Sequence, residues 1–458
     1  MKKAFFNLLR IALVVLLAQA TLLYAESLPR LHAEGRRIVD ESGNTVLLKG
    51  LCLTNNVWGA YVPGVSEKLK AQGLDVMIRP LRQDSWSLTN DDFKRLEEPG
   101  LNCVRYCFNY QLFAADNPER DANLRRLREH VERFAAAGIY TIPVLMMAPG
   151  LDTQNDLTEF PKPGPKRIKS VFEDDRFYAQ WLDMWAYVAT GLKDLPGVAG
   201  YEIINEPRIP CDAEGGAAIF GERMTAVCRE IRKHDERRII FVPECNSVEA
   251  NPGEKYWNNN KGCLVTDGGE QGVIWKTAFA KIDLPNIVYV MHFYGDFNFT
   301  ALGEGSIDEK TMAESVEARV RLADEIGKAP LICTEYGIAR ANSNEVRAAW
   351  LEKTHALFAK YGISATFFSY KTPVGAYIHM KRNFWSIYGE YENMRNEIVP
   401  RGDGSWDFAS DDLGKMAEKN GFASIIDKYN FSKGTIARVS LVDNGPVLDE
   451  LRRFWLEK

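Results

Sequence analysis

Short apolar runs alternate with amphipathic segments along most of the chain. Eight runs have the length of buried strands, and several are bounded by glycine, proline or asparagine: 48–53, 101–106, 139–146, 198–204, 238–242, 287–293, 330–334 and 363–369. Segments with helical periodicity lie between most of them, at 123–137, 177–192, 219–231, 312–326 and 345–361. Apolar strands that alternate with amphipathic helices are typical of a parallel sheet covered by helices.

Eight such strands predict a closed (β/α)8 barrel, with a last helix at 447–456 closing the ring of helices. An open doubly wound sheet is the alternative, but no glycine-rich phosphate loop follows an early strand. Residues 31–50 predict a β-hairpin before the first barrel strand, with a continuous strand at 31–39, a turn at 40–44 and a second strand at 45–48.

Three long polar stretches interrupt this alternation, at 55–92, 246–285 and 371–410. Each would leave the carboxyl end of a strand, where barrel enzymes carry their binding loops. We therefore expect them to form the walls of a substrate cleft, and surface loops without a ligand role are the alternative.

The first 25 residues have the pattern of a signal peptide. Lys2 and Lys3 precede a largely apolar run at 11–25, and Ala18-Gln19-Ala20 fits a cleavage site. An uncleaved anchor is the alternative, although the uninterrupted run is shorter than the roughly 20 residues of a membrane-spanning helix. We expect export to the periplasm or the medium, no stable membrane association after cleavage, and one barrel domain at 26–458.

Composition and charge exclude several classes of protein. The formal net charge is −5, so the chain lacks the basic surplus that binds nucleic acid. The 6 histidines show no metal-ligand spacing and the 8 cysteines form no C-x-x-C pair, so no metal or other cofactor is expected. Most cysteines are expected to be buried thiols, with one or two disulfides possible. A G-x-S-x-G nucleophile elbow is absent.

Two carboxylates follow apolar strands of the predicted barrel. Glu206 ends the run 201–206 and precedes Pro207, which stops strand pairing. Glu335 follows the apolar run 331–334, three strands later. In a barrel both would point toward one mouth, and a pair of carboxylates at such a mouth is the basic requirement of glycoside hydrolysis.

In this respect the chain resembles glycoside hydrolase family 5, the cellulase-like family of retaining barrel glycosidases. The motifs occur in the family's order: the hairpin at 35–50, Gly100–Arg105 (G-x-N-x-V-R), Asn205-Glu206-Pro207, His292-Phe293-Tyr294, Thr334–Gly337 and Ser369–Lys371. The resemblance implies hydrolysis of a β-linked glycan, with a β-glucan of the cellulose type first and a β-mannan or a glycolipid as alternatives. Oligomeric state stays open.

The same resemblance implies roles for the residues of these motifs. Glu335 would be the nucleophile that forms a glycosyl-enzyme, and Glu206 would be the acid/base. Three further residues would support them, with Arg105 keeping Glu335 ionised, Tyr294 orienting Glu335 and Asn205 binding the sugar 2-hydroxyl. His292 would contact the substrate or the catalytic network.

Departures from the family pattern concern the substrate side of the site. Met146 stands where the family usually has a histidine, Phe368 stands where it usually has a tryptophan platform, and Cys52 stands where an asparagine is common. Phe368 retains a ring that stacks on sugar. These changes lend weight to a different class, a carbohydrate-binding barrel without catalysis, whereas retention of both glutamates argues against it.

The tryptophans divide into two groups by position. Trp181 and Trp185 are four residues apart on a predicted helix, which favours the core. Four others lie in the expected cleft loops and are the candidates for stacking on sugar rings: Trp58, Trp257, Trp275 and Trp385.

Overall fold

The computed structural model of the 458-residue chain describes residues 28–56, 88, 90–149, 171–207, 216–248, 263–270, 273–296, 299–300, 303, 305–339, 342–370, 398–400, 406–408 and 445–457. The expected signal peptide at 1–25 lies outside these residues, as do most of the stretches 55–92 and 371–410. Trp58, Trp257, Trp385 and the side chain of Trp275 lie outside them too.

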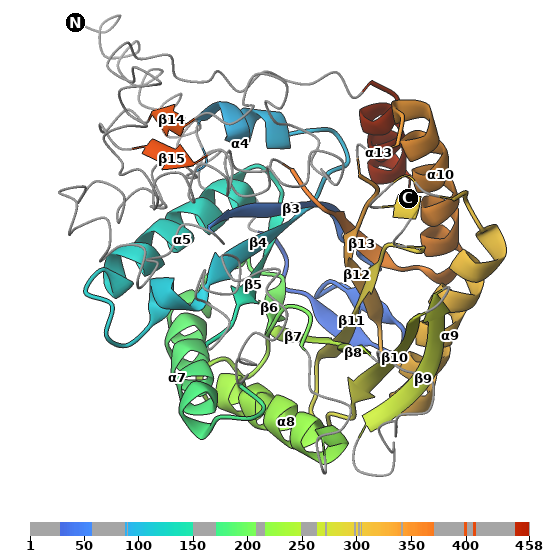
Figure 1. Ribbon diagram of the computed structural model, residues 1–458. Coiled ribbons are helices and arrows are strands. Elements are labelled where there is room, and N and C mark those ends of the chain that lie inside the picture. The colour runs from blue at the N-terminus through green and yellow to red at the C-terminus, as the bar shows by residue number, and fades with distance from the viewer. Residues whose placement is uncertain are drawn as a thin grey trace, which may run out of the picture.

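Eight parallel strands close into a barrel in the order β11-β12-β13-β3-β4-β5-β6-β7 (Figure 1). The strands are β3 (Lys49–Asn56), β4 (Cys103–Asn109), β5 (Tyr140–Met147), β6 (Gly200–Glu202), β7 (Ile239–Pro243), β11 (Ile287–Phe293), β12 (Leu331–Tyr336) and β13 (Ser364–Phe367). Each corresponds to one predicted apolar run, which confirms the (β/α)8 fold. The runs are apolar throughout because one face of each strand fills the barrel and the other packs on helices.

Helices surround the barrel (Figure 1). They are α4 (Asn90–Leu96), α5 (Arg120–Ala136), α7 (Asp175–Leu192), α8 (Gly216–His234), α9 (Glu309–Gly327), α10 (Asn344–Tyr361) and α13 (Gly445–Leu456), with a 3-10 turn η2 (Tyr110–Phe113). In α5, for example, the buried residues Leu127, Val131 and Phe134 recur at helical spacing and face the strands. No helix in the described part of the chain is long and apolar enough to cross a bilayer.

The crossover from β7 to β11 differs from the expected polar loop. It contains a three-stranded antiparallel sheet of β8 (Cys245–Val248), β10 (Val273–Ala280) and β9 (Cys263–Glu270), in that order. This sheet lies between α8 and α9 in the outer ring, where the other crossovers have a helix (Figure 1). The expectation of a loop is therefore wrong for β9 and β10, because two β-prone runs two residues apart pair as antiparallel strands, and whether they line a cleft stays a prediction.

The stretch 371–410 also contains strands, since β14 (Ile398–Pro400) and β15 (Trp406–Phe408) pair antiparallel. Whether this stretch or 55–92 lines a cleft stays a prediction.

An N-terminal hairpin closes the amino end of the barrel. β1 (His32–Glu34) and β2 (Arg37–Val39) pair antiparallel, and Leu31 and Ile38 belong to the same buried cluster as Ile142. The predicted hairpin is confirmed, but its turn lies inside the run 31–39, at Gly35, where φ is 56° and a side chain would be strained. The turn expected at 40–44 is present and brings Thr45 to Val39.

The last helix, α13, is tied to both the barrel and its neighbour α10. The Lys49 ammonium group, at the start of β3, donates to the carbonyl oxygens of Phe454 and Glu457, each at 2.8 Å. His355 on α10 lies 2.7 Å from Glu450 and stacks on the ring of Phe454. The predicted closure of the ring by this helix is confirmed.

We predict that Gly50→Ala strongly destabilises the barrel. A methyl group on Gly50 would lie 1.6 Å from the carbonyl oxygen of Cys103 in the adjacent strand, and two paired strands have no freedom to separate. The free energy of unfolding, measured in urea, should fall by about 3 kcal/mol or more. Gly191→Ala is the control, since its methyl group meets only the movable end of Leu124 and should cost much less. Equal effects would contradict this explanation.

Candidate active site

Charged and polar side chains gather at the carboxyl ends of the barrel strands, above the apolar layer that fills the amino end. Arg105 comes from β4, Glu202 from β6 and Glu335 from β12. Glu206 lies four residues beyond Glu202, and His292 comes from β11. Parallel strands bring these positions to one mouth although they are far apart in the sequence.

Arg105 is fully buried and binds three different side chains. Its guanidinium donates to both oxygens of Glu202, at 2.7 and 2.6 Å, to Glu335 at 2.5 Å and to the amide oxygen of Asn205 at 2.8 Å. Burial by itself lowers the pKa of Arg105, but the charges of Glu202 and Glu335 outweigh burial and raise the pKa well above its ordinary value. The site therefore contains a permanent cation.

Glu335 is almost entirely buried, at 4% exposure, and is held from three sides. Arg105 donates to one of its oxygens, and the hydroxyl of Tyr294 donates to the other at 2.8 Å. The Nδ1 atom of His292 lies 3.6 Å from that second oxygen. Burial raises the pKa of Tyr294 well above its ordinary value, so its hydroxyl remains a donor.

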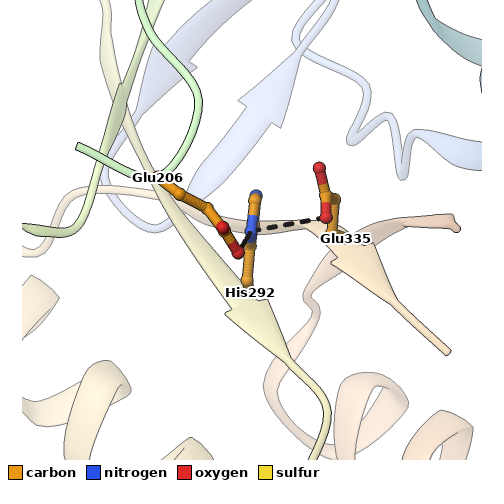
Figure 2. Close-up of side chains that lie close together, drawn as sticks. All are labelled: Glu206, His292 and Glu335. Atoms are coloured by element: carbon orange, nitrogen blue, oxygen red, sulfur yellow. Dashed lines mark hydrogen bonds and ion pairs between the residues drawn. The ribbon is translucent and has the colours of Figure 1, made fainter. Parts of the chain in front are cut away.

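Glu206 is more accessible than Glu335, with 30% of its side chain exposed. His292 Nδ1 lies 2.9 Å from one of its oxygens. In Figure 2 the imidazole stands between the two carboxylates, and one ligating atom from each of the three residues lies within 4.8 Å of the others.

The backbone at Glu206 adopts a strained conformation, with φ at 38°. Such a conformation in a residue other than glycine costs on the order of 1–3 kcal/mol, and Pro207 restricts the same residue further. The preceding chain is fixed by two indoles, since Trp181 and Trp185 both donate to the carbonyl oxygen of Ile203, at 2.9 and 2.8 Å. Their predicted core position is confirmed, and the core thus sets the position of Glu206.

His292 carries a shifted pKa. Burial lowers the pKa of this imidazole, but the charge of Glu335, the hydrogen bond to Glu206 and the charge of Glu206 together raise it above the ordinary value. Its Nε2 atom lies 3.2 Å from the Thr334 hydroxyl oxygen, and its backbone N–H donates to Glu244 at 3.2 Å. Contacts at both ring nitrogens and at the backbone N–H therefore hold His292 in place.

Sequence reasoning missed three residues of this network, Glu202, Thr334 and Glu244. Glu244 follows β7, is buried, and accepts from Arg319 of α9 at 2.8 and 3.2 Å as well as from His292. Each of the three interrupts or ends an apolar strand, and that signal was available in the sequence. The sequence could not indicate which residue each of them binds, because that partner comes from another strand or helix.

The three residues that depart from the family pattern, Cys52, Met146 and Phe368, lie on or directly after strands of the barrel. Cys52 is buried 4.0 Å from the Arg105 guanidinium, and burial raises the pKa of Cys52 to about 12, so it stays a thiol. Met146 is half-buried near the end of β5 and packs against Cys107. Phe368 is half-buried and directly follows β13. Among the described residues, six cysteines are buried free thiols.

The spacing of Glu206, His292 and Glu335 also falls within the range of metal ligands. However, both oxygens of Glu335 already accept hydrogen bonds, from Arg105 and from Tyr294, and the guanidinium charge repels a second cation. This arrangement suits proton transfer and nucleophilic attack better than metal binding.

Residues 66–373, more than half of the chain, match the Cellulase family, described as glycosyl hydrolase family 5. The chain belongs to glycosyl hydrolase family 5, as its motifs had indicated.

Two curated relatives and one solved structure illustrate its similarities. A β-xylosidase of Phanerodontia chrysosporium is 29% identical over 248 residues, which cover 50% of each chain. An endoglucanase of Paenibacillus polymyxa is 23% identical over 270 residues, covering 58% of this chain and 60% of the relative. The chain thus spans about half the length of the curated relatives it matches. The crystal structure of an endogalactoceramidase has a TM-score of 0.53 at 18% identity, covering 85% of this chain and 84% of the other, and shows a shared fold.

We predict that Glu244→Leu destabilises the protein by about 3–5 kcal/mol, because it removes the carboxylate that balances the charge of the half-buried Arg319 and accepts from the His292 N–H. Urea denaturation measures the change. The matched control is Arg36→Met, which breaks the solvent-exposed pair with Asp324 and should cost less than about 1 kcal/mol. A loss below about 1 kcal/mol for Glu244→Leu would contradict a structural role for this pair.

Proposed function

We propose that the chain is a retaining β-glycosidase that hydrolyses a β-linked glycan by double displacement. Glu335 is the nucleophile and Glu206 the acid/base. The observation that carries the proposal is that one carboxylate oxygen of Glu206 lies within 4.8 Å of one of Glu335, so the two groups face each other with His292 between them. Inverting enzymes keep their carboxyl groups about 6.5–9.5 Å apart to admit a water molecule, whereas retaining enzymes keep them about 5–5.5 Å apart.

In the first step, Glu335 attacks the anomeric carbon and the bond to the leaving oxygen breaks. Arg105 donates to one oxygen of Glu335 and Tyr294 donates to the other, so the carboxylate is held in a fixed orientation. The leaving oxygen takes a proton from Glu206, whose greater exposure suits contact with the departing group and later with water. The product of this step is a sugar ester of Glu335.

In the second step, Glu206 takes a proton from a water molecule, and the resulting hydroxide equivalent displaces Glu335 from the anomeric carbon. His292 holds Glu206 in place during both steps. Asn205 presents its amide oxygen to Arg105, which has only donors, so the amide nitrogen is left to donate to the sugar 2-hydroxyl. That contact strengthens in the transition state of glycoside hydrolysis.

A β-glucan of the cellulose type is the substrate we propose, and the protein acts on it after export. Membership of the cellulase family supports this choice, as does the endoglucanase among its relatives. The β-xylosidase relative makes β-xylosides the second group to test. Met146 and Phe368 lie at or next to the ends of their strands, so they would contact the sugar rather than the reacting carboxylates.

Hydrolysis by Glu206→Ala and Glu335→Ala, with azide added, tests the assignment of roles. Substrates are β-glucans, β-mannans and aryl β-glycosides, including xylosides. Glu335→Ala should lose hydrolysis, and azide should restore turnover with an α-glycosyl azide as product, because azide replaces the nucleophile. Glu206→Ala should lose about 10²–10⁴-fold on substrates with poor leaving groups. With activated substrates, this variant should give a β-glycosyl azide, because azide replaces water.

The control for these variants is Glu352→Ala, which removes an exposed glutamate of α10 and should hydrolyse like the wild type. Azide products of the same anomeric configuration from both variants would overturn the two roles. If the wild type hydrolyses no substrate, and wild type and variants bind a glycan equally, the chain is a carbohydrate-binding barrel without catalysis.

A further inference from the structure

The hydroxyl group of Thr334 connects His292 to the carboxylate of Glu202. Its oxygen lies 3.2 Å from His292 Nε2 and 3.2 Å from Glu202 Oε1. A hydroxyl has one hydrogen to donate, together with lone pairs that accept. The direction of one of these bonds therefore fixes the direction of the other.

Glu202 determines that direction. It is fully buried, and Arg105 donates to both of its oxygens in a bidentate pair. A carboxylate paired in this way is ionised and acts only as an acceptor. The Thr334 hydrogen must therefore point to Glu202, so the Thr334 oxygen accepts from His292, and Nε2 of His292 carries a hydrogen.

With Nε2 protonated, Nδ1 is the atom of His292 that faces Glu206, at 2.9 Å. Two states fit this contact. Either neutral His292 accepts a hydrogen bond from protonated Glu206, or the imidazolium donates to ionised Glu206. Both states contain the same number of protons, and they differ only in which atom holds the proton between them.

We propose that Thr334 keeps a hydrogen on Nε2 of His292, and that Glu206 and Nδ1 of His292 consequently share one further proton, which is the proton delivered to the leaving group. Thr334 is a positioning residue that acts through His292. The inference rests on the proposed role of Glu206 as the acid/base.

The charges around His292 favour retention of this proton. Glu335, at 3.6 Å, and Glu206 favour the protonated pair, and Glu244 accepts from the backbone N–H of His292. Arg105 opposes protonation of the imidazole, but the carboxylates outweigh it, and the pKa of His292 is raised. Since the two groups titrate as a pair, loss of their shared proton should set the alkaline limb of kcat/KM.

Thr334→Val removes the acceptor at nearly constant volume. The buried Nε2–H then has no partner, so the neutral form with hydrogen on Nδ1 and an ionised Glu206 becomes favoured. The pair thus gives up its shared proton at lower pH. We expect the alkaline limb to move down by about one pH unit, from the usual cost of an unpaired buried donor. Thr334→Ser retains the hydroxyl and should restore the wild-type limb.

The measurement is kcat/KM against pH for the wild type and both variants, on aryl glycosides of the sugar that the wild type hydrolyses. Leaving groups should range from phenol to 2,4-dinitrophenol. For Thr334→Val at neutral pH, we expect a loss of roughly 10-fold or more with phenol and within about threefold with dinitrophenol, since depletion of the protonated pair chiefly affects poor leaving groups. A uniform loss, an unmoved limb, or equal behaviour of the valine and serine variants would overturn the inference.

A second measurement does not depend on folding of the valine variant. In ¹⁵N-histidine-labelled wild type, with the signals of His292 assigned from His292→Asn, Nε2 should carry a hydrogen at the pH of maximal activity. An unprotonated Nε2 there would overturn the inference. Failure of the azide experiment would remove the role of Glu206 itself. If the azide experiment gives the expected products but the alkaline limb of Thr334→Val does not move, only the role of Thr334 is overturned.

Discussion

The buried guanidinium of Arg105 is the interaction on which the site depends. A charge inside a barrel is costly unless it is paired and hydrogen-bonded on every side. Glu202, Glu335 and Asn205 supply that pairing from two other strand ends, so the requirement to neutralise Arg105 fixes where all three side chains lie. One cation thus fixes the position of Glu335 and, through Glu202, the direction of the Thr334 hydroxyl.

The two carboxylates beside this cation differ in environment. Glu335 is buried and bonded to a cation and a phenol, whereas Glu206 is partly exposed on a strained backbone and bonded to an imidazole. Environments that differ in this way assign opposite roles to chemically identical groups. The strain at Glu206 is supported by the core, through the two indoles that bind the Ile203 carbonyl.

Sequence patterns predicted the barrel because strands buried on both faces must be apolar along their whole length, as Ile287–Phe293 and Ile239–Pro243 are. They also indicated Glu206 and Glu335, since a charged residue at the end of such a strand lies at the mouth of the barrel, whereas Arg105 was indicated by the resemblance to the family. Other features of the fold could not be predicted from the sequence. The sheet that contains β9 and β10 stands between α8 and α9, where the other crossovers have a helix, and the run of polar residues before it did not indicate strands.

The hydrogen bonds of the site were equally beyond local sequence reasoning. Glu202 and Glu244 each bind an arginine from a distant element, and nothing adjacent in the chain names that partner. Resemblance to a family supplied the roles proposed for Glu206 and Glu335, whereas the contacts of Thr334 with His292 and Glu202 come only from the structure.

The central claim is that the two carboxylates act by double displacement. The most direct test follows hydrolysis of a β-glycoside by ¹H NMR and records the anomeric configuration of the sugar before it mutarotates. The close approach of Glu206 and Glu335 predicts that the β-anomer forms first. Initial formation of the α-anomer would mean a single displacement by water and would contradict the role of Glu335 as nucleophile.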